Sequence, residues 1–110
     1  MTDITVETTS SGAVVVLPRG RLDMTSGSLL REHLRTQVQN GNTRLVVDLA
    51  GVDLIDSAGL SALIAGLKAA RQAGGSLHVT NPSTQVLAVM QLTNLQWLLD
   101  PVESADGDSV

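Results

Sequence analysis

Residues 48–63 read DLAGVDLIDSAGLSAL, and this stretch decides how the rest of the chain is interpreted. Its first part is extended and apolar and ends at Asp56 and Ser57. Beyond it, apolar side chains recur with the spacing of one helix face, at Leu60, Leu63, Ile64, Leu67 and Ala70. The stretch therefore predicts a strand that passes, at Ser57, into an amphipathic helix.

The segments on both sides follow the same two patterns. Before this stretch we expect strands at residues 4–8 and 13–17, a helix at 26–39 and a strand at 44–49. The strands at 13–17 and 44–49 are apolar enough to be buried, the first of them on both faces. After the central helix we expect a strand at 76–80, a short helix that begins after residues 81–83, and a last strand at 95–99.

This order of elements predicts the fold class. The first two strands should form an antiparallel hairpin, and the strands joined through helices should be parallel neighbours. The expected fold is α/β, a single domain at residues 1–102 with a mixed β-sheet packed against amphipathic helices. Residues 103–110 are small, polar and acidic, and we expect a disordered tail there.

Composition narrows the classes of function. The 110 residues are 43% hydrophobic with Trp97 as the one aromatic side chain, so the core must be aliphatic. The absence of Cys excludes disulfides and thiolate metal sites. A net charge of −4 with scattered Lys and Arg argues against nucleic acid as a partner. His33 and His78 have no further ligands at metal-binding spacing, so we expect no metal and no cofactor.

The N-terminal residues lack the charged and then apolar layout of a signal segment, and the apolar runs are too short to span a bilayer. We therefore expect a cytoplasmic protein with no membrane partner. Monomer is the default expectation for its oligomeric state.

Ser57 has two interpretations. A serine at a helix start commonly caps the helix, because its hydroxyl accepts a hydrogen bond from the first turn, and the local pattern alone favours this role. A serine in that place is also accessible to the active site of another protein. Phosphorylation there would add about −1.5 to −2 charge, which a helix N-terminus tolerates. Because Asp56 already carries a negative charge, a phosphoryl group on Ser57 would break a complex with a partner rather than unfold the domain.

The same residues resemble a known family. The segment DSAGL at 56–60, after DLAGV at 48–52, is similar to the phosphorylation-site motif of bacterial anti-sigma factor antagonists of the STAS family. The segment GRLD at 20–23 resembles a second motif of this family, and GG at 74–75 and NP at 81–82 also match. The resemblance extends over most of the chain and agrees with the order of strands and helices above.

The resemblance implies partner switching. The unphosphorylated protein would bind an anti-sigma factor, a serine kinase of the histidine-kinase-like ATPase fold, and thereby release a sigma factor. The kinase would phosphorylate Ser57, and a PP2C-type phosphatase would reset it. Asp23 would assist phosphorylation or docking, and Asp56, Ala58 and Gly59 would flank Ser57 in the partner-binding site. Asp23 could equally cap the first helix.

Two departures from the family pattern concern the site and the C-terminal region. Ala58 replaces a second serine that often follows the acceptor, which leaves Ser57 as the one candidate there. Asn94 replaces a glycine after the third helix, and asparagine also tolerates the left-handed conformation.

Two other functions compete with the switch. An enzyme with Ser57 as its nucleophile is disfavoured, because the Gly-x-Ser-x-Gly elbow and a P-loop are both missing. The second alternative is a STAS scaffold, or an accessory subunit of a signalling or transport assembly, that is never phosphorylated.

Overall fold

The computed structural model describes residues 3–99, and the expected tail and domain boundary at 102 lie outside this range. In chain order the elements are β1 (Ile4–Thr8), β2 (Val14–Pro18), β3 (Gly20–Leu22), α1 (Met24–Gln39), β4 (Arg44–Asp48), β5 (Val52–Ile55), α2 (Ser57–Gln72), β6 (Ser76–Thr80), α3 (Thr84–Leu92) and the 3₁₀ helix η1 (Gln96–Leu98).

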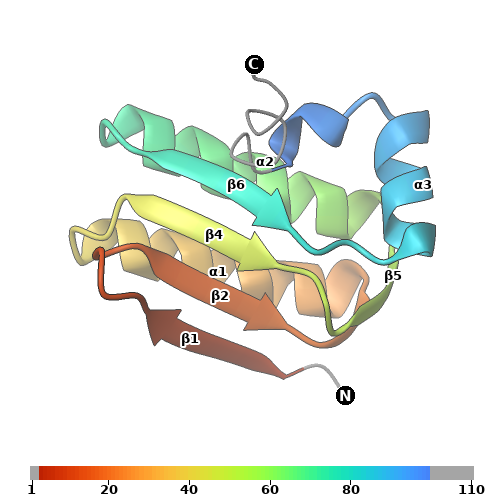
Figure 1. Cartoon of the computed structure of the whole chain (residues 1–110), viewed down its shortest axis with the longest axis horizontal. Helices are drawn as coiled ribbons and strands as arrows, with labels where there is room; N and C mark the ends of the chain where they lie inside the picture. The colour runs from red at the N-terminus through yellow and green to blue at the C-terminus, as the bar shows by residue number, and fades with distance from the viewer. Residues whose placement is uncertain (1–2, 100–110) are drawn as a thin grey trace.

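Four of the strands form the main sheet, in the order β1-β2-β4-β6. β1 and β2 are an antiparallel hairpin, while β2 with β4 and β4 with β6 are parallel (Figure 1). Both expected relationships are therefore confirmed, and the fold is the predicted α/β class. β5 does not join this sheet; it pairs in parallel with β3, a strand of three residues that is too short to leave a periodic pattern.

The core lies between the main sheet and the helices α1 and α2, which cover the same face of the sheet (Figure 1). Alternate strand residues point into it and are buried: Val14, Val16, Leu45, Val47, Leu77 and Val79. The residues between them, including Val46 and His78, are only half-buried. The prediction that strand 13–17 is buried on both faces is thus wrong, because helices cover one face, and β-branched residues also favour half-buried strands.

α1 and α2 lie side by side and approach each other closely. A Cβ atom on Gly27 would stand 2.9 Å from the carbonyl oxygen of Ala58, and one on Gly66 would stand 2.5 Å from Cδ1 of Leu34. The contact of Gly27 with Ala58 joins the N-terminal turns of the two helices. The contact of Leu34 with Gly66 joins positions further along each helix. The first turn of α1 therefore lies against the first turn of α2.

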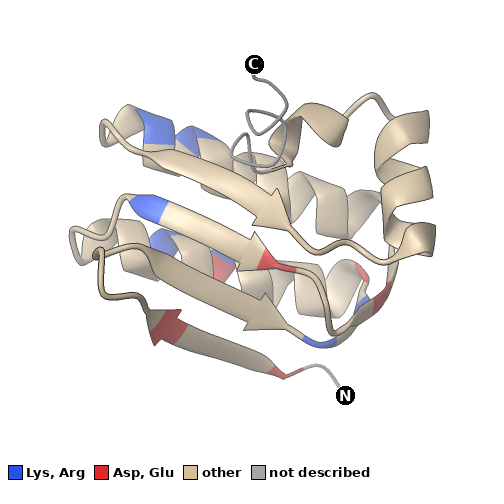
Figure 2. Cartoon of the chain, viewed as in Figure 1, with Lys and Arg blue, Asp and Glu red and all other residues tan. Residues whose placement is uncertain are grey.

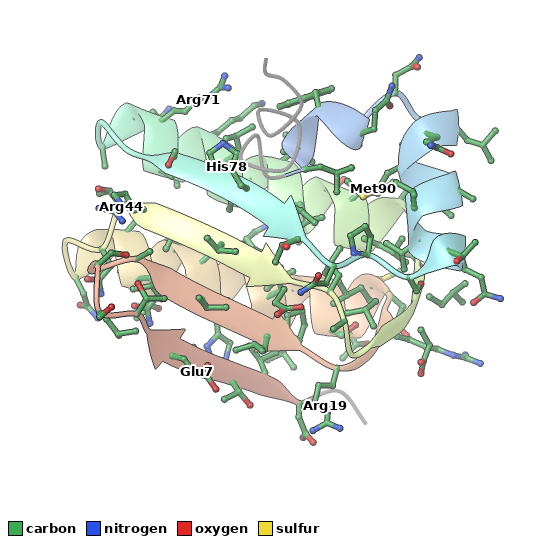
Figure 3. All side chains as sticks on the ribbon, in the orientation of Figure 1. Glu7, Arg19, Arg44, Arg71, His78 and Met90 are labelled. Carbon is green, nitrogen blue, oxygen red and sulfur yellow. The ribbon has the colours of Figure 1, made fainter. Side chains whose placement is uncertain are left out.

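The end of the domain differs from the prediction. α3 starts after the Ser83 cap as expected, and its Met90 points into the core (Figure 3). The strand expected at 95–99 is wrong, because residues 96–98 form the η1 turn and Leu99 alone makes a bridge, with Val79. Leu98 is buried there while Trp97 is 53% exposed, so the alternation that suggested a strand does not reflect burial. Asn94 has φ 58°, the left-handed conformation expected for it.

Candidate phosphorylation and partner-binding site

Asp56 caps α2, and Ser57 is the first helical residue after it. The Oδ1 atom of Asp56 accepts hydrogen bonds from the N–H groups of Ala58 at 2.9 Å and of Gly59 at 3.1 Å. Ser57 is exposed, and its hydroxyl makes no hydrogen bond within residues 3–99. The capping interpretation of Ser57 is therefore wrong, since the neighbouring carboxylate already performs that role.

Asp23 caps α1, which confirms its structural interpretation. Its Oδ1 atom accepts from the N–H groups of Thr25 and Ser26, and the Ser26 hydroxyl oxygen accepts from the N–H of Asp23 at 2.8 Å. This reciprocal capping box starts the helix at Met24 rather than at the predicted Ser26. Ser26 is buried, and its hydroxyl also donates to the carbonyl of Arg21, which fixes the end of β3 to α1.

The same hydrogen bonds affect the charge of Asp23. The backbone N–H of Ser26, and then its hydroxyl, hold the pKa of the Asp23 carboxyl below its ordinary value, because both donate to the ionised form. Asp23 is exposed, so this ionised carboxylate is accessible at the surface of the domain.

The two capped helix starts meet at one end of the molecule. The N–H of Asp56 donates to the carbonyl of Leu22 at 3.1 Å, and Leu22 directly precedes Asp23. A Cβ atom on Gly59 would stand 2.7 Å from that same Leu22 oxygen. The structure therefore brings together Asp23, Asp56 and the start of α2, which are far apart in the sequence. Charged residues lie at both ends of the molecule, and one of these is the end where β3 and β5 run into the helices (Figure 2).

The predicted partner-binding residues differ in their accessibility. Asp23, Asp56 and Ser57 are exposed, Ala58 is half-buried and Gly59 is buried. Position 59 requires a glycine, because a Cβ atom there would stand 2.7 Å from Cγ1 of Ile55 as well as from the Leu22 oxygen. Its place in the motif therefore has a packing reason, and a direct contact of Gly59 with a partner stays a prediction.

A groove of about 500 Å³ runs from Ser57 along the exposed side of α2. It is lined by Arg31, Ser57, Leu60, Ser61, Ile64, Ala65, Lys68, Thr93 and Leu95. Its walls are largely apolar, and the charged side chains that line it are both cationic. Sequence analysis missed this groove because its residues come from three separate segments.

A second hollow, of about 610 Å³, lies beside the Asp23 cap and is lined by Gly20, Arg21, Asp23, Thr25, Ser26, Leu29 and Asp53. Within residues 3–99, His, Asp and Glu side chains nowhere gather in threes that could hold a metal ion. In the same part of the chain, every helix is too short or too polar to cross a membrane.

Comparisons with known proteins agree with this fold. The family model described as "Mlab, STAS domain" matches residues 4–100. An anti-sigma-B factor antagonist of Bacillus subtilis is 30% identical over 88 residues, which cover 80% of each chain. An anti-sigma factor antagonist from Mycobacterium paratuberculosis has a similar structure, with a TM-score of 0.78, 25% identity and coverage of 90% of this chain and 83% of that one.

A third similar structure is that of the Bacillus cell fate determinant SpoIIAA in its phosphorylated form. It has a TM-score of 0.70 and 20% identity, and the match covers 94% of this chain and 97% of that one. The chain therefore belongs to the STAS family of anti-sigma factor antagonists. Members of this family are regulators and not enzymes, and the chain is accordingly a regulator.

Proposed function

We propose that this protein binds an anti-sigma factor serine kinase while Ser57 is unphosphorylated, releases a sigma factor by doing so, and is switched off by phosphorylation of Ser57. One observation carries the proposal: the Ser57 hydroxyl is exposed and unbonded within residues 3–99, because Asp56 caps the helix in its place. A side chain in this state can enter the active site of a kinase without any part of the fold opening.

In the proposed reaction the Ser57 Oγ atom attacks the γ-phosphorus of ATP. The Oγ–P bond forms, the bond to the β-phosphate oxygen breaks, ADP leaves and the hydroxyl proton passes to solvent. The kinase docks on the surface formed by Asp23, Asp56, Ser57 and Ala58. Asp23 contributes an ionised carboxylate to this surface, because its pKa is lowered by the Ser26 donors.

The phosphoryl group weakens the binding of the partner kinase. It adds about −1.5 to −2 charge next to Asp56, and a partner packed over this turn would have to remove water from both groups. The complex therefore dissociates after transfer, and a PP2C-type phosphatase restores the binding form. The protein acts in the cytoplasm as a monomer. The relative SpoIIAA, whose phosphorylated form has been solved, gives a precedent for a phosphoryl group on this fold.

The proposal is tested with purified candidate kinases and ATP, followed by mass spectrometry of the peptide that contains Ser57. Ser57→Ala should bind the kinase and stay bound after ATP is added, while Ser57→Asp should fail to bind in calorimetry. Ser61 provides the matched control, because it is exposed on the same helix one turn later and lines the same groove. Ser61→Ala and Ser61→Asp should be phosphorylated at Ser57 like the wild type.

A STAS scaffold that is never phosphorylated predicts the opposite result. It would show no added mass on the Ser57 peptide with any kinase, and Ser57→Asp would bind its partners as tightly as the wild type. Exposure of Ser57 favours the switch over the scaffold, because a scaffold has no need of an unbonded hydroxyl at this position.

A further inference from the structure

The groove beside Ser57 contains a cation that has no partner. Arg31 of α1 is exposed and forms no ion pair or hydrogen bond through its side chain within residues 3–99, although it lines the same groove as Ser57. Arg35, one turn further along α1, is instead paired with Glu32. Lys68 also lines the groove, but it follows Ser57 by eleven residues, which is about 16 Å along the axis of α2.

The packing of the helices directs Arg31 toward the first turn of α2. Gly27 contacts Ala58, and Arg31 lies on the same side of α1 one turn later. Side chains of a helix lean toward its N-terminus, so Arg31 can reach back toward the turn that contacts Ala58, from a position where it also lines a smaller hollow with Arg35, Ala65 and Gly66. This is the side of the groove at which Ser57 stands.

A phosphoryl group on Ser57 needs such a cation, because the helix start cannot supply its usual donors. The N–H of Asp56 donates to the Leu22 carbonyl, and those of Ala58 and Gly59 donate to the Asp56 carboxylate. Three of the backbone donors that could have held an anion are thus already used, and Asp56 adds a repelling charge. Besides the N–H of Ser57 itself, the group at this end of the groove that can compensate the phosphate charge is Arg31.

We propose that Arg31 binds the phosphoryl group of phosphorylated Ser57 within the same molecule. Its planar guanidinium can donate two parallel hydrogen bonds to phosphate oxygens. The inference rests on the proposed modification of Ser57 and assigns what the modified side chain binds. The phosphoserine turns toward α1 and lies over the mouth of the groove, so the modification covers part of the surface that the unmodified protein leaves open.

The test uses full-length protein with phosphoserine inserted at position 57 during translation, and it follows the phosphorus-31 NMR signal as the pH is changed. Arg31→Gln should raise the second pKa of the phosphate by roughly half a unit, the size expected for loss of an exposed ion pair. Lys68→Gln and Arg35→Gln are the matched controls and should leave this pKa unchanged. Arg31→Lys should give an intermediate value, because it keeps the charge and loses the paired donors. Asp56 and Asp23, the other charges near this turn, are present in every variant.

An unchanged pKa in Arg31→Gln would overturn the proposal, and so would equal increases in Arg31→Gln and Lys68→Gln, which would show a general effect of charge. Because the phosphoserine is inserted without a kinase, these results do not depend on the proposed partner. Failure of the proposed function would appear separately, as the absence of ATP-dependent phosphorylation. The melting temperature of unmodified Arg31→Gln should equal that of the wild type, which checks that the variant folds.

Discussion

At the first turn of α2, two neighbouring residues perform two different tasks. Asp56 satisfies backbone N–H groups and stabilises the helix, while Ser57 leaves its hydroxyl exposed. A serine that served as the cap would keep its oxygen in a hydrogen bond to the backbone, and a kinase would have to break that bond. Separation of the two roles makes Ser57 accessible at no cost to the fold.

This separation predicts different stabilities for two alanine variants. Ser57→Ala should change the free energy of unfolding by less than about 0.5 kcal/mol, as expected for an exposed residue without partners. Asp56→Ala should lower it by about 1 kcal/mol, because two N–H groups lose their acceptor. Urea denaturation of the two variants and the wild type measures both values. The reverse order would mean that Ser57 is the functional cap.

Asp23 should make stability depend on pH in the acid range. Its pKa in the folded protein is below the ordinary value of 3.8, so the ionised carboxylate contributes stability that is fully present above about pH 5. This contribution is lost as the pH falls through 3.8 and then through the lowered pKa of the folded state. Asp23→Asn retains an N-cap but cannot titrate, and its melting temperature should therefore fall less steeply below pH 4. Equal slopes for the variant and the wild type would contradict this account.

At the scale of elements, prediction from the sequence succeeded where the pattern was long. The sixteen residues of α2 carry a continuous apolar stripe, and the central strands are runs of Val and Leu, so these elements were predicted with their order and direction. β3 and η1, each of three residues, were missed or assigned wrongly because their conformation depends on contacts with distant segments.

The candidate site could be predicted only in part, because local patterns do not show contacts between distant segments. Asp56 and Ser57 are adjacent in the sequence, and their place at a helix start followed from the pattern around them. Which of the two caps the helix is a matter of backbone geometry, and the local pattern wrongly favoured Ser57. The groove and the position of Arg31 depend on how α1 packs against α2, which local patterns do not contain.

The contact between β3 and α2 predicts the effect of a side chain at Gly59. In Gly59→Ala the new Cβ would stand within 3 Å of Cγ1 of Ile55, the Leu22 oxygen and the Leu22 Cβ. Overpacking of this kind should lower the free energy of unfolding by about 1–3 kcal/mol, even though alanine favours helices. Ser61→Ala on the same helix is the control and should be close to neutral. A more stable Gly59→Ala variant would show that β3 can move away from α2.

At the scale of the whole molecule, the helices α1 and α2 cover one face of the main sheet, and the proposed modification site lies at the end where both helices begin (Figure 1). The core is formed by aliphatic side chains from every strand of the main sheet except the edge strand β1, whose Ile4 and Val6 pack against it half-buried. A charge added at the exposed Ser57 therefore lies outside this aliphatic core.

This arrangement predicts that phosphorylation changes the surface and leaves the fold intact. Proton–nitrogen NMR spectra of the protein with and without phosphoserine at position 57 should differ at the starts of α1 and α2 and along the groove. Signals from β1, β2 and β4 should stay in place, because the core lies between these strands and the helices. Shifts spread over the whole sheet would instead indicate a rearranged domain.

The division of labour between Asp56 and Ser57 also bears on how such domains diverge during evolution. A single substitution at Ser57 would abolish the proposed regulation while the helix and the core persisted, since neither uses that hydroxyl. Proteins with this fold can therefore lose the proposed phosphorylation through one mutation and keep a folded domain. Loss of Asp56, by contrast, would be selected against in regulated and unregulated descendants alike.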